Sequence, residues 1–274
     1  MLIGAFFAVA GTFWTGEPLL GLALAVGASL IVALVFAFVV VDLGGDAIVA
    51  GLAVNILALG LTTYLMVPVF GVQGSFYDPS LRGLPPLHFP VVEGIPVLAT
   101  LLSGHSVLVY LALGLALAAH VFLFRHPLGI HTRAVGEHPV AAASMGLPVR
   151  RIQYLMVALS GILCGLAGAQ LSISLVNQFV QGMTAGRGFI ALVAVIFGRA
   201  NPLGVLAACV MFGFAYALSL RLQGVGIPPQ FVAMLPYLAT IAVLIVVAVR
   251  SGAARRRALR PIEAVEAAER PEQA

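Results

Sequence analysis

The chain has 274 residues, of which 61% are apolar and 9% charged, whereas soluble domains carry roughly 45–50% apolar and about 25% charged residues. The formal net charge is +4 and every basic residue is arginine, but the arginines do not form the continuous basic surface expected of a nucleic-acid-binding protein. A mean hydropathy of +1.10 therefore indicates an integral membrane protein and excludes an ordinary soluble enzyme.

The hydropathy pattern predicts an all-α, polytopic membrane bundle with about eight segments. Helices are expected because a spanning segment must satisfy its backbone hydrogen bonds internally, and the apolar runs lack the alternation of barrel strands. Most runs reach the roughly 20 residues needed to cross a bilayer, but the first and the sixth are shorter. The expected segments are residues 1–14, 18–41, 46–67, 104–124, 152–174, 188–198, 203–221 and 230–249.

The positions of the arginines predict the orientation of the segments, because Lys and Arg concentrate in cytoplasmic loops. Arginines gather in the loop 125–151 and in the charged tail 251–274, so we place both in the cytoplasm. The proline-rich loop 71–103 then lies outside, where an irregular, partly ordered structure is expected. The prediction is a multi-pass membrane domain over residues 1–250 with a cytoplasmic C-terminus.

The loop 125–151 contains a helix signal of its own. Pro139 suits a first helical position, Gly146 suits the residue just beyond the end, and Pro148 prevents the helix from continuing. A short helix of small residues flanked by arginines can dock a soluble partner or can simply lie at the membrane interface. The residues themselves leave both alternatives open.

The run R-A-V-G-E-H-P-V-A-A-A-S-M-G over 133–146 resembles the coupling-helix loop of ABC importer permeases, in the family that serves simple sugars, nucleosides and branched-chain amino acids. In that family the segment sits in a cleft of the ATPase subunit and passes on nucleotide-driven motion. His138 departs from the family pattern, in which Asn is more usual at this position. The resemblance implies coupling roles for Gly136, Glu137, His138, Pro139, Ala141, Ala142 and Gly146.

The stretch 181–204 is rich in glycine but lacks the Gly-Lys-Ser/Thr of a nucleotide-binding loop, because the chain contains no lysine. ATP hydrolysis is therefore expected on a separate subunit, and this chain is expected to have no catalytic residues. The glycines favour a helix break and close packing, and a gating role is the alternative. The letters G-R-G-F-I-A-L and I-F-G-R-A-N-P-L-G most resemble the nucleoside-type permeases, which work with binding lipoproteins.

Polar residues in or beside the apolar segments are the candidates for a transport pathway, since polar groups at membrane depth usually face a bundle interior or water. For each such residue, including Gln170, Ser172 and Ser174, the alternative to lining a pathway is an interhelical hydrogen bond. Gly161, Gly165 and Ala169 have a spacing that favours close helix packing. The candidate pathway and gating residues are Asn55, Asn177, Gln178, Gly186, Arg187, Gly188 and Phe189.

Neither a metal nor a cofactor is expected. The histidines of the cytoplasmic loop, His126, His131 and His138, do not have zinc-site spacing. An intramembrane enzyme would need a nucleophile and base or a metal set, which the sequence lacks. A self-sufficient secondary transporter or channel would require buried ionisable groups for ion coupling, and the apolar segments contain almost none.

The resemblance covers residues 1–250 and implies a permease subunit in a bacterial inner membrane. Its implied partners are a second permease, an ABC ATPase, an extracytoplasmic binding lipoprotein and the surrounding lipid. The implied substrate is a nucleoside or simple sugar, with branched-chain amino acids as the alternative. The first residues, 1–6, resemble the middle of the family's second helix. We expect either that the chain begins upstream, with a further span, or that it is truncated.

Overall fold

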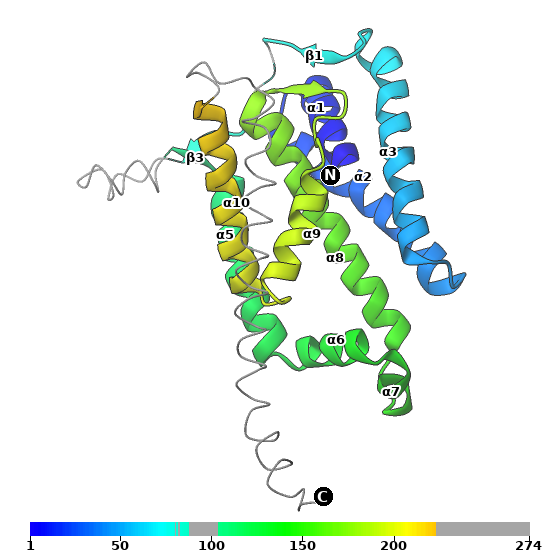
Figure 1. Ribbon diagram of the computed structural model, residues 1–274. Helices are drawn as coiled ribbons and strands as arrows, with labels where there is room; N and C mark the ends of the chain where they lie inside the picture. Colours follow the sequence, from blue (N-terminus) through cyan, green and yellow to red (C-terminus); the bar gives the residue numbers. More distant parts are fainter. Residues whose placement is uncertain (80, 82, 88–103, 223–274) are drawn as a thin grey trace, which may run out of the picture. The chain divides into compact units, whose positions relative to one another are not determined.

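The computed structural model describes residues 1–79, 81, 83–87 and 104–222 (Figure 1). Over these residues it is mostly helical, and five helices are long and apolar enough to cross a membrane. The prediction of a polytopic helical protein is confirmed, but the count of eight segments is not. The expected segment 230–249 and the tail 251–274 lie outside the described part. The five helices are Pro18–Asp42, Ala47–Phe70, Val107–Arg125, Val149–Val176 and Pro202–Arg221.

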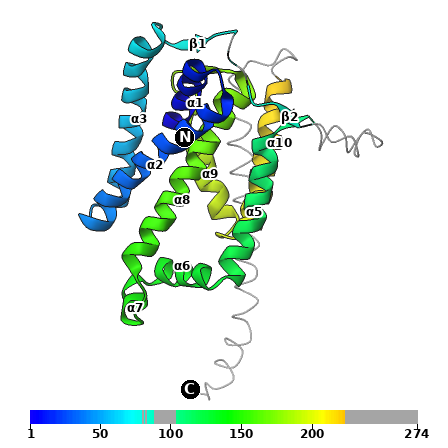
Figure 2. The ribbon, with the colours of Figure 1, turned by 180° about the vertical axis from the view of Figure 1, so that it is seen from behind.

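The described residues divide into two units, 1–189 and 190–222, which we describe separately. The first unit is built around α1 (Leu2–Thr15), α2 (Pro18–Ala37) and α8 (Val149–Ala169). Figures 1 and 2 show α2 crossing α8 beside α1. Ten of the 14 residues of α1 are buried, so this short helix is enclosed by protein.

Glycines allow these three helices to approach each other closely. A Cβ atom on Gly4 would lie 2.9 Å from the Gly165 Cα atom, and one on Gly161 would lie 2.4 Å from the Ala33 Cβ atom. Ala169 is fully buried at the end of the same α8 face. The predicted small-residue packing of Gly161, Gly165 and Ala169 is therefore confirmed.

Both α2 and α8 end in a π-helical segment. The first, η1 (Phe38–Asp42), continues α2, and the second, η3 (Gln170–Val176), continues α8. The expected segments 18–41 and 152–174 are thus each one apolar element whose last turns are π-helical. Such turns are rare and frequently mark functional positions.

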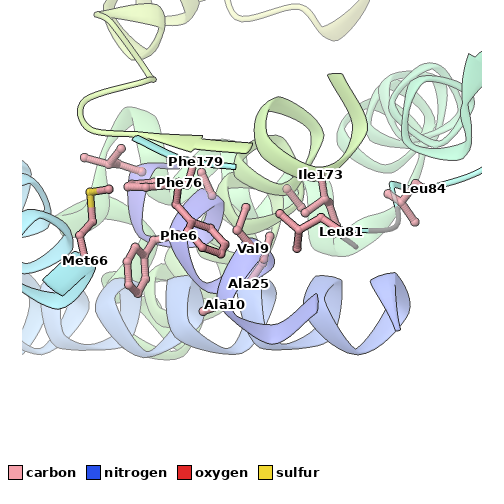
Figure 3. Packing of buried hydrophobic residues seen from close by; sticks show 14 of the residues in the cluster. Phe6, Val9, Ala10, Ala25, Met66, Phe76, Leu81, Leu84, Ile173 and Phe179 are labelled. Carbon is pink, nitrogen blue, oxygen red and sulfur yellow. The ribbon is translucent and has the colours of Figure 1, made fainter. Parts of the chain in front are cut away.

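An aromatic core lies where α1 meets α3 (Ala47–Phe70) and the strands (Figure 3). The rings of Phe6 and Phe179 meet edge to face with centroids 5.3 Å apart. Those of Phe70 and Phe76 stack at 4.1 Å. These contacts hold one end of α3 to α1 through large buried aromatic surfaces.

The described residues of the loop 71–103 include two short strands, which fits the expected irregular, partly ordered loop. Two short antiparallel pairs occur: β1 (Ser75–Tyr77) with β4 (Gln178–Val180), and β2 (Pro86–Leu87) with β3 (His105–Ser106). These pairings join segments far apart in sequence, a kind of contact that local composition does not reveal. Since β1 follows α3 and β4 follows η3, we name this end of the first unit the β1–β4 end.

The first turn of α3 is capped by Asp46, whose Oδ1 atom accepts hydrogen bonds from the backbone N–H groups of Ile48 at 2.8 Å and Val49 at 3.0 Å. Replacing Asp46 with Ala should cost about 1 kcal/mol of folding free energy. The measurement is thermal unfolding of the purified permease in detergent. Asp46→Asn retains the cap and is the matched control, so equal melting temperatures of the two variants would contradict the prediction.

The second unit contains most of α9 (Arg187–Phe197) together with α10 (Pro202–Leu222). The two helices form a hairpin whose core includes Ala194, Ala208 and Phe212. A Cβ atom on Gly198 would lie 2.4 Å from the Val205 backbone nitrogen, so the turn needs glycine there. The 11 residues of α9 extend about 17 Å, which is too short to cross a hydrocarbon core of about 30 Å.

Candidate functional site

Two helices occupy the loop that follows α5 (Val107–Arg125), where the sequence predicted one. The additional helix is α6 (Pro127–Glu137), which Figure 1 shows lying across the end of the unit. His126 caps it, since its Nδ1 atom accepts a hydrogen bond from the Leu128 N–H group at 3.2 Å. The His126-Pro127 pair was the available signal, because it places a cap immediately before proline at the first helical position.

The turn from α5 into α6 is tight. A Cβ atom on Gly129 would lie 1.9 Å from the Phe122 carbonyl oxygen, so no other residue fits without moving the backbone. Arg133 of α6 places its Cζ atom 4.8 Å from the centre of the Phe124 ring, within range of a cation–π attraction. These two contacts fix the angle between α5 and α6.

The predicted short helix is present as α7 (Pro139–Ser144), with Pro139 in its first turn. Gly146 adopts the left-handed conformation, with a φ of 81°, as expected for the residue beyond a helix end. The Leu147 N–H group donates to the Ala142 carbonyl at 3.1 Å and closes that end. Sequence reasoning therefore located α7 and both of its boundaries correctly.

A small core joins α6, α7 and the first turn of α8. It consists of the buried side chains of Val135, Ala142 and Ile152, with Leu147, Val149 and Met156 packed around them. Ala142 is only 3% exposed, so its side chain supports the hairpin from inside and is not available to a partner. The rotation of a six-residue helix depends on such packing, which the sequence does not reveal.

The remaining predicted coupling positions are exposed on α7 and its flanks, and their coupling role stays a prediction. They are Gly136, Glu137, His138, Pro139, Ala141 and Gly146. Two residues that sequence reasoning missed dominate this surface: Val140 is 81% exposed and Met145 is 82% exposed. Apolar side chains at the tip of a polar loop were the signal that could have identified them, because such patches often mark contacts with other proteins.

The structure does not bring the seven candidate pathway residues to one place. Asn55 is exposed on the half of α3 nearer Asp46, whereas Asn177 and Gln178 lie at the β1–β4 end. Asn177 has a φ of 50°, and its amide lies so close to Gly83 that a Cβ atom there would be 2.4 Å from Oδ1. A side chain at position 83 would thus displace the Asn177 amide.

The other four pathway candidates follow β4. Gly186 has a φ of 76°, and the Arg187 Nη1 atom donates to the Met183 carbonyl at 2.7 Å. Gly188 is exposed, and Phe189 is 64% exposed. These residues form the turn at which α9 begins, so their observed role is to start that helix, and gating stays a prediction.

Two more of the polar residues in the apolar segments form hydrogen bonds within the first unit. The Ser106 Oγ atom donates to the Gln170 Oε1 atom at 2.8 Å, which ties the start of α5 to η3. The Ser172 Oγ atom donates to the Gly168 carbonyl at 3.2 Å. For Gln170 the structure therefore supplies the interhelical hydrogen bond, whereas Ser172 bonds within its own helix and its role stays a prediction.

Two histidines of the loop lie at helix ends in the described structure. His126 caps α6 and His138 precedes α7. Within the described residues, no group of three or more His, Cys, Asp or Glu side chains is arranged to hold a metal ion.

Comparisons with known proteins address the identity of the chain. Residues 1–244 match the family described as branched-chain amino acid transport system / permease component. The guanosine ABC transporter permease protein NupQ of Bacillus subtilis is 34% identical over 89% of this chain and 79% of its own length. The nucleoside ABC transporter permease protein NupC of Lactococcus lactis subsp. cremoris is 33% identical over 89% and 80%.

A third relative is the putative glucose ABC transporter permease protein TsgC13 of Haloferax volcanii, 32% identical over 93% of this chain and 83% of its own. No solved structure matches the chain. The resemblance of 133–146 and 181–204 to ABC importer permeases is confirmed by these matches. The chain therefore belongs to the branched-chain amino acid transport system permease-component family, as a multi-pass membrane subunit of a transporter.

Proposed function

We propose that this chain is the permease subunit of an ABC importer for nucleosides. The substrate class is supported by the relatives named for guanosine and for nucleosides. The glucose name of a third relative makes a simple sugar the second candidate. The family title mentions branched-chain amino acids, but none of these three relatives carries that name.

The observation that carries the proposal is the geometry of α7. The C-terminal end of this helix is closed by Gly146 and the Leu147 N–H group, the helix projects from the unit, and its surface exposes Val140 and Met145. An exposed apolar tip on a short helix is suited to a protein groove. The groove we propose is that of a separate ABC ATPase subunit, which supplies the energy of ATP hydrolysis to a chain that contains no lysine for a nucleotide loop.

The orientation follows from the same proposal. The end that carries α6 and α7 faces the cytoplasm and the ATPase, and the β1–β4 end faces outward to a binding lipoprotein. The two ends of the first unit are separated by the length of α8 and η3, 28 residues in all, or about 42 Å. A second, homologous permease completes the pathway, the membrane is that of a bacterial cell, and the C-terminus is cytoplasmic.

Substrate choice is tested by uptake into vesicles that contain the complete complex with its ATPase, second permease and binding protein. We expect ATP-dependent uptake of labelled guanosine to exceed uptake of labelled glucose or leucine by at least about tenfold, which corresponds to 1.4 kcal/mol of discrimination. Vesicles loaded with a non-hydrolysable ATP analogue are the control. A preference for glucose would support the sugar alternative, and leucine uptake without guanosine uptake would contradict both candidates.

A further inference from the structure

One carboxylate joins two elements at the α6–α7 end of the first unit. Asp42 is the last residue of η1 and accepts hydrogen bonds from two side chains in the first turns of α8. The Arg150 Nη2 atom contacts Oδ1, and the Tyr154 hydroxyl donates to Oδ2. The Asp42 side chain is 19% exposed and that of Arg150 is 72% exposed, so the pair lies at the surface of the unit and the carboxylate is its more covered member.

The α8 residues of this contact are connected to the loop helices through a shared core. Ile152 lies between Arg150 and Tyr154 in sequence, and it is part of the core that it shares with Ala142 of α7 and Val135 of α6. A buried core transmits displacement because it is close-packed and resists compression. A force on α7 therefore reaches the turn of α8 that holds Asp42.

Asp42 is connected to α3 through the short turn that follows it in the chain. Only Gly44, with a φ of 67°, Gly45 and Leu43 separate Asp42 from Asp46, the residue that caps α3. The buried side chains of α3 are Thr62 and Met66, both toward the β1–β4 end. The half of α3 that begins at Ala47 and carries Asn55 has no buried side chain in the described structure, so its position depends strongly on this turn.

We propose that Asp42 is a positioning residue for transport, which transfers movement of α7 and the start of α8 to the base of α3. The proposal rests on the proposed function, because it assumes that an ATPase moves α7. The salt bridge adds little to stability, since water screens its exposed arginine. Its position is the reason to assign it this role. It joins the first turns of α8, which pack against the loop helix that a partner pushes, to the end of η1, which lies a few residues before the membrane helix that carries a pathway candidate.

The first test measures coupling in vesicles that contain the complete complex. ATP hydrolysis and guanosine uptake are measured on the same preparation for wild type, Asp42→Asn and Arg150→Gln. We expect hydrolysis and co-purification of the ATPase to persist, while uptake per ATP falls at least about fivefold, the lower end of typical coupling between sites. The exchanged pair, Asp42→Arg with Arg150→Asp, should recover part of this loss.

The matched control is Arg151→Gln, which removes a neighbouring exposed arginine that is not bound to Asp42. If Arg150 served only to attract anionic lipid, Arg150→Gln and Arg151→Gln would behave alike and the exchanged pair would recover nothing. Equal losses of hydrolysis and uptake in Asp42→Asn would also overturn the proposal, because they would indicate failed docking or folding.

A second test does not depend on the ATPase. Spin labels are placed at Leu43→Cys and Leu155→Cys, both exposed positions, in the full chain with Cys164 and Cys209 replaced by Ala. In lipid vesicles, Asp42→Asn should broaden the distance distribution between the labels, and Arg151→Gln should leave it narrow. An unchanged distribution in Asp42→Asn overturns the proposal even when transport is affected.

The two tests separate this inference from the proposed function. A wild-type complex that hydrolyses ATP but takes up none of the three substrates would refute the substrate assignment, whereas the labels would still report whether Asp42 holds α2 to α8. If Asp42→Asn broadens the distances but keeps the wild-type uptake per ATP, the contact is only structural and its role in transport is refuted.

Discussion

Replacing Ala141 with tryptophan is expected to abolish transport while the permease stays folded in the membrane. Ala141 lies on the exposed side of α7, whereas its neighbour Ala142 is buried in the hairpin core. A bulky ring at 141 therefore obstructs a docked partner without disturbing the hairpin itself. Uptake and co-purification of the ATPase should both fall to background, and the permease alone should melt at the wild-type temperature.

The contrast with Ala142→Trp makes this prediction specific. That variant inserts an aromatic ring among Val135 and Ile152, where overpacking costs about 1–3 kcal/mol, so it should lower the melting temperature as well as uptake. Glu137→Arg reverses an exposed charge beside α7 and should weaken docking without melting the hairpin. Ala264→Trp in the tail is the bulk-matched control. Near-normal uptake in both Ala141→Trp and Glu137→Arg would remove the coupling assignment.

Replacing Gly21 with alanine is expected to destabilise the first unit severely for a single methyl group. A Cβ atom there would lie 2.6 Å from the Ala8 carbonyl oxygen and 2.2 Å from the Thr12 Oγ1 atom of α1. The Ala8 contact is with backbone, so α1 and α2 must move apart. We expect a loss of about 1–3 kcal/mol, measured as a lower unfolding temperature in detergent.

Gly27 offers a matched control in the same helix, because a Cβ atom there meets nothing within 4 Å. Gly27→Ala should be neutral or should stabilise by about 0.5–1 kcal/mol, since alanine is the better helix former. Gly165→Ala tests the opposite face, where a Cβ atom would lie 2.8 Å from the Val26 Cα atom. If Gly21→Ala and Gly27→Ala melt at the same temperature, the close approach of α1 and α2 is wrong.

Features that depend on local chemistry were predictable from the sequence. Apolar runs located the membrane helices, and the spacing of Gly161, Gly165 and Ala169 identified a packed face of α8. Pro139 and Gly146 gave the boundaries of α7 because each fixes its own backbone conformation. These signals act within a few residues and do not require knowledge of the fold.

Features that depend on distant contacts were missed. The pairing of β1 with β4 joins residues about 100 positions apart. Nothing in the sequence of the proline-rich loop indicates the segment with which β1 pairs. The inward side of α7 is set by Ile152 of the next helix, so Ala142 could not be separated from Ala141 by sequence. The contact between Asp42 and Arg150 is long-range for the same reason.

The enclosure of α1 has a consequence for how the protein is made. Ten of its 14 residues are buried, so α1 depends on its neighbours for most of its contacts. Yet the face of Gly165 against which Gly4 packs is synthesised about 160 residues later, or about 8–30 s at typical translation rates. During that interval the Gly4 face of α1 lacks its α8 partner, which makes the docking of α1 onto α8 a late step in biogenesis.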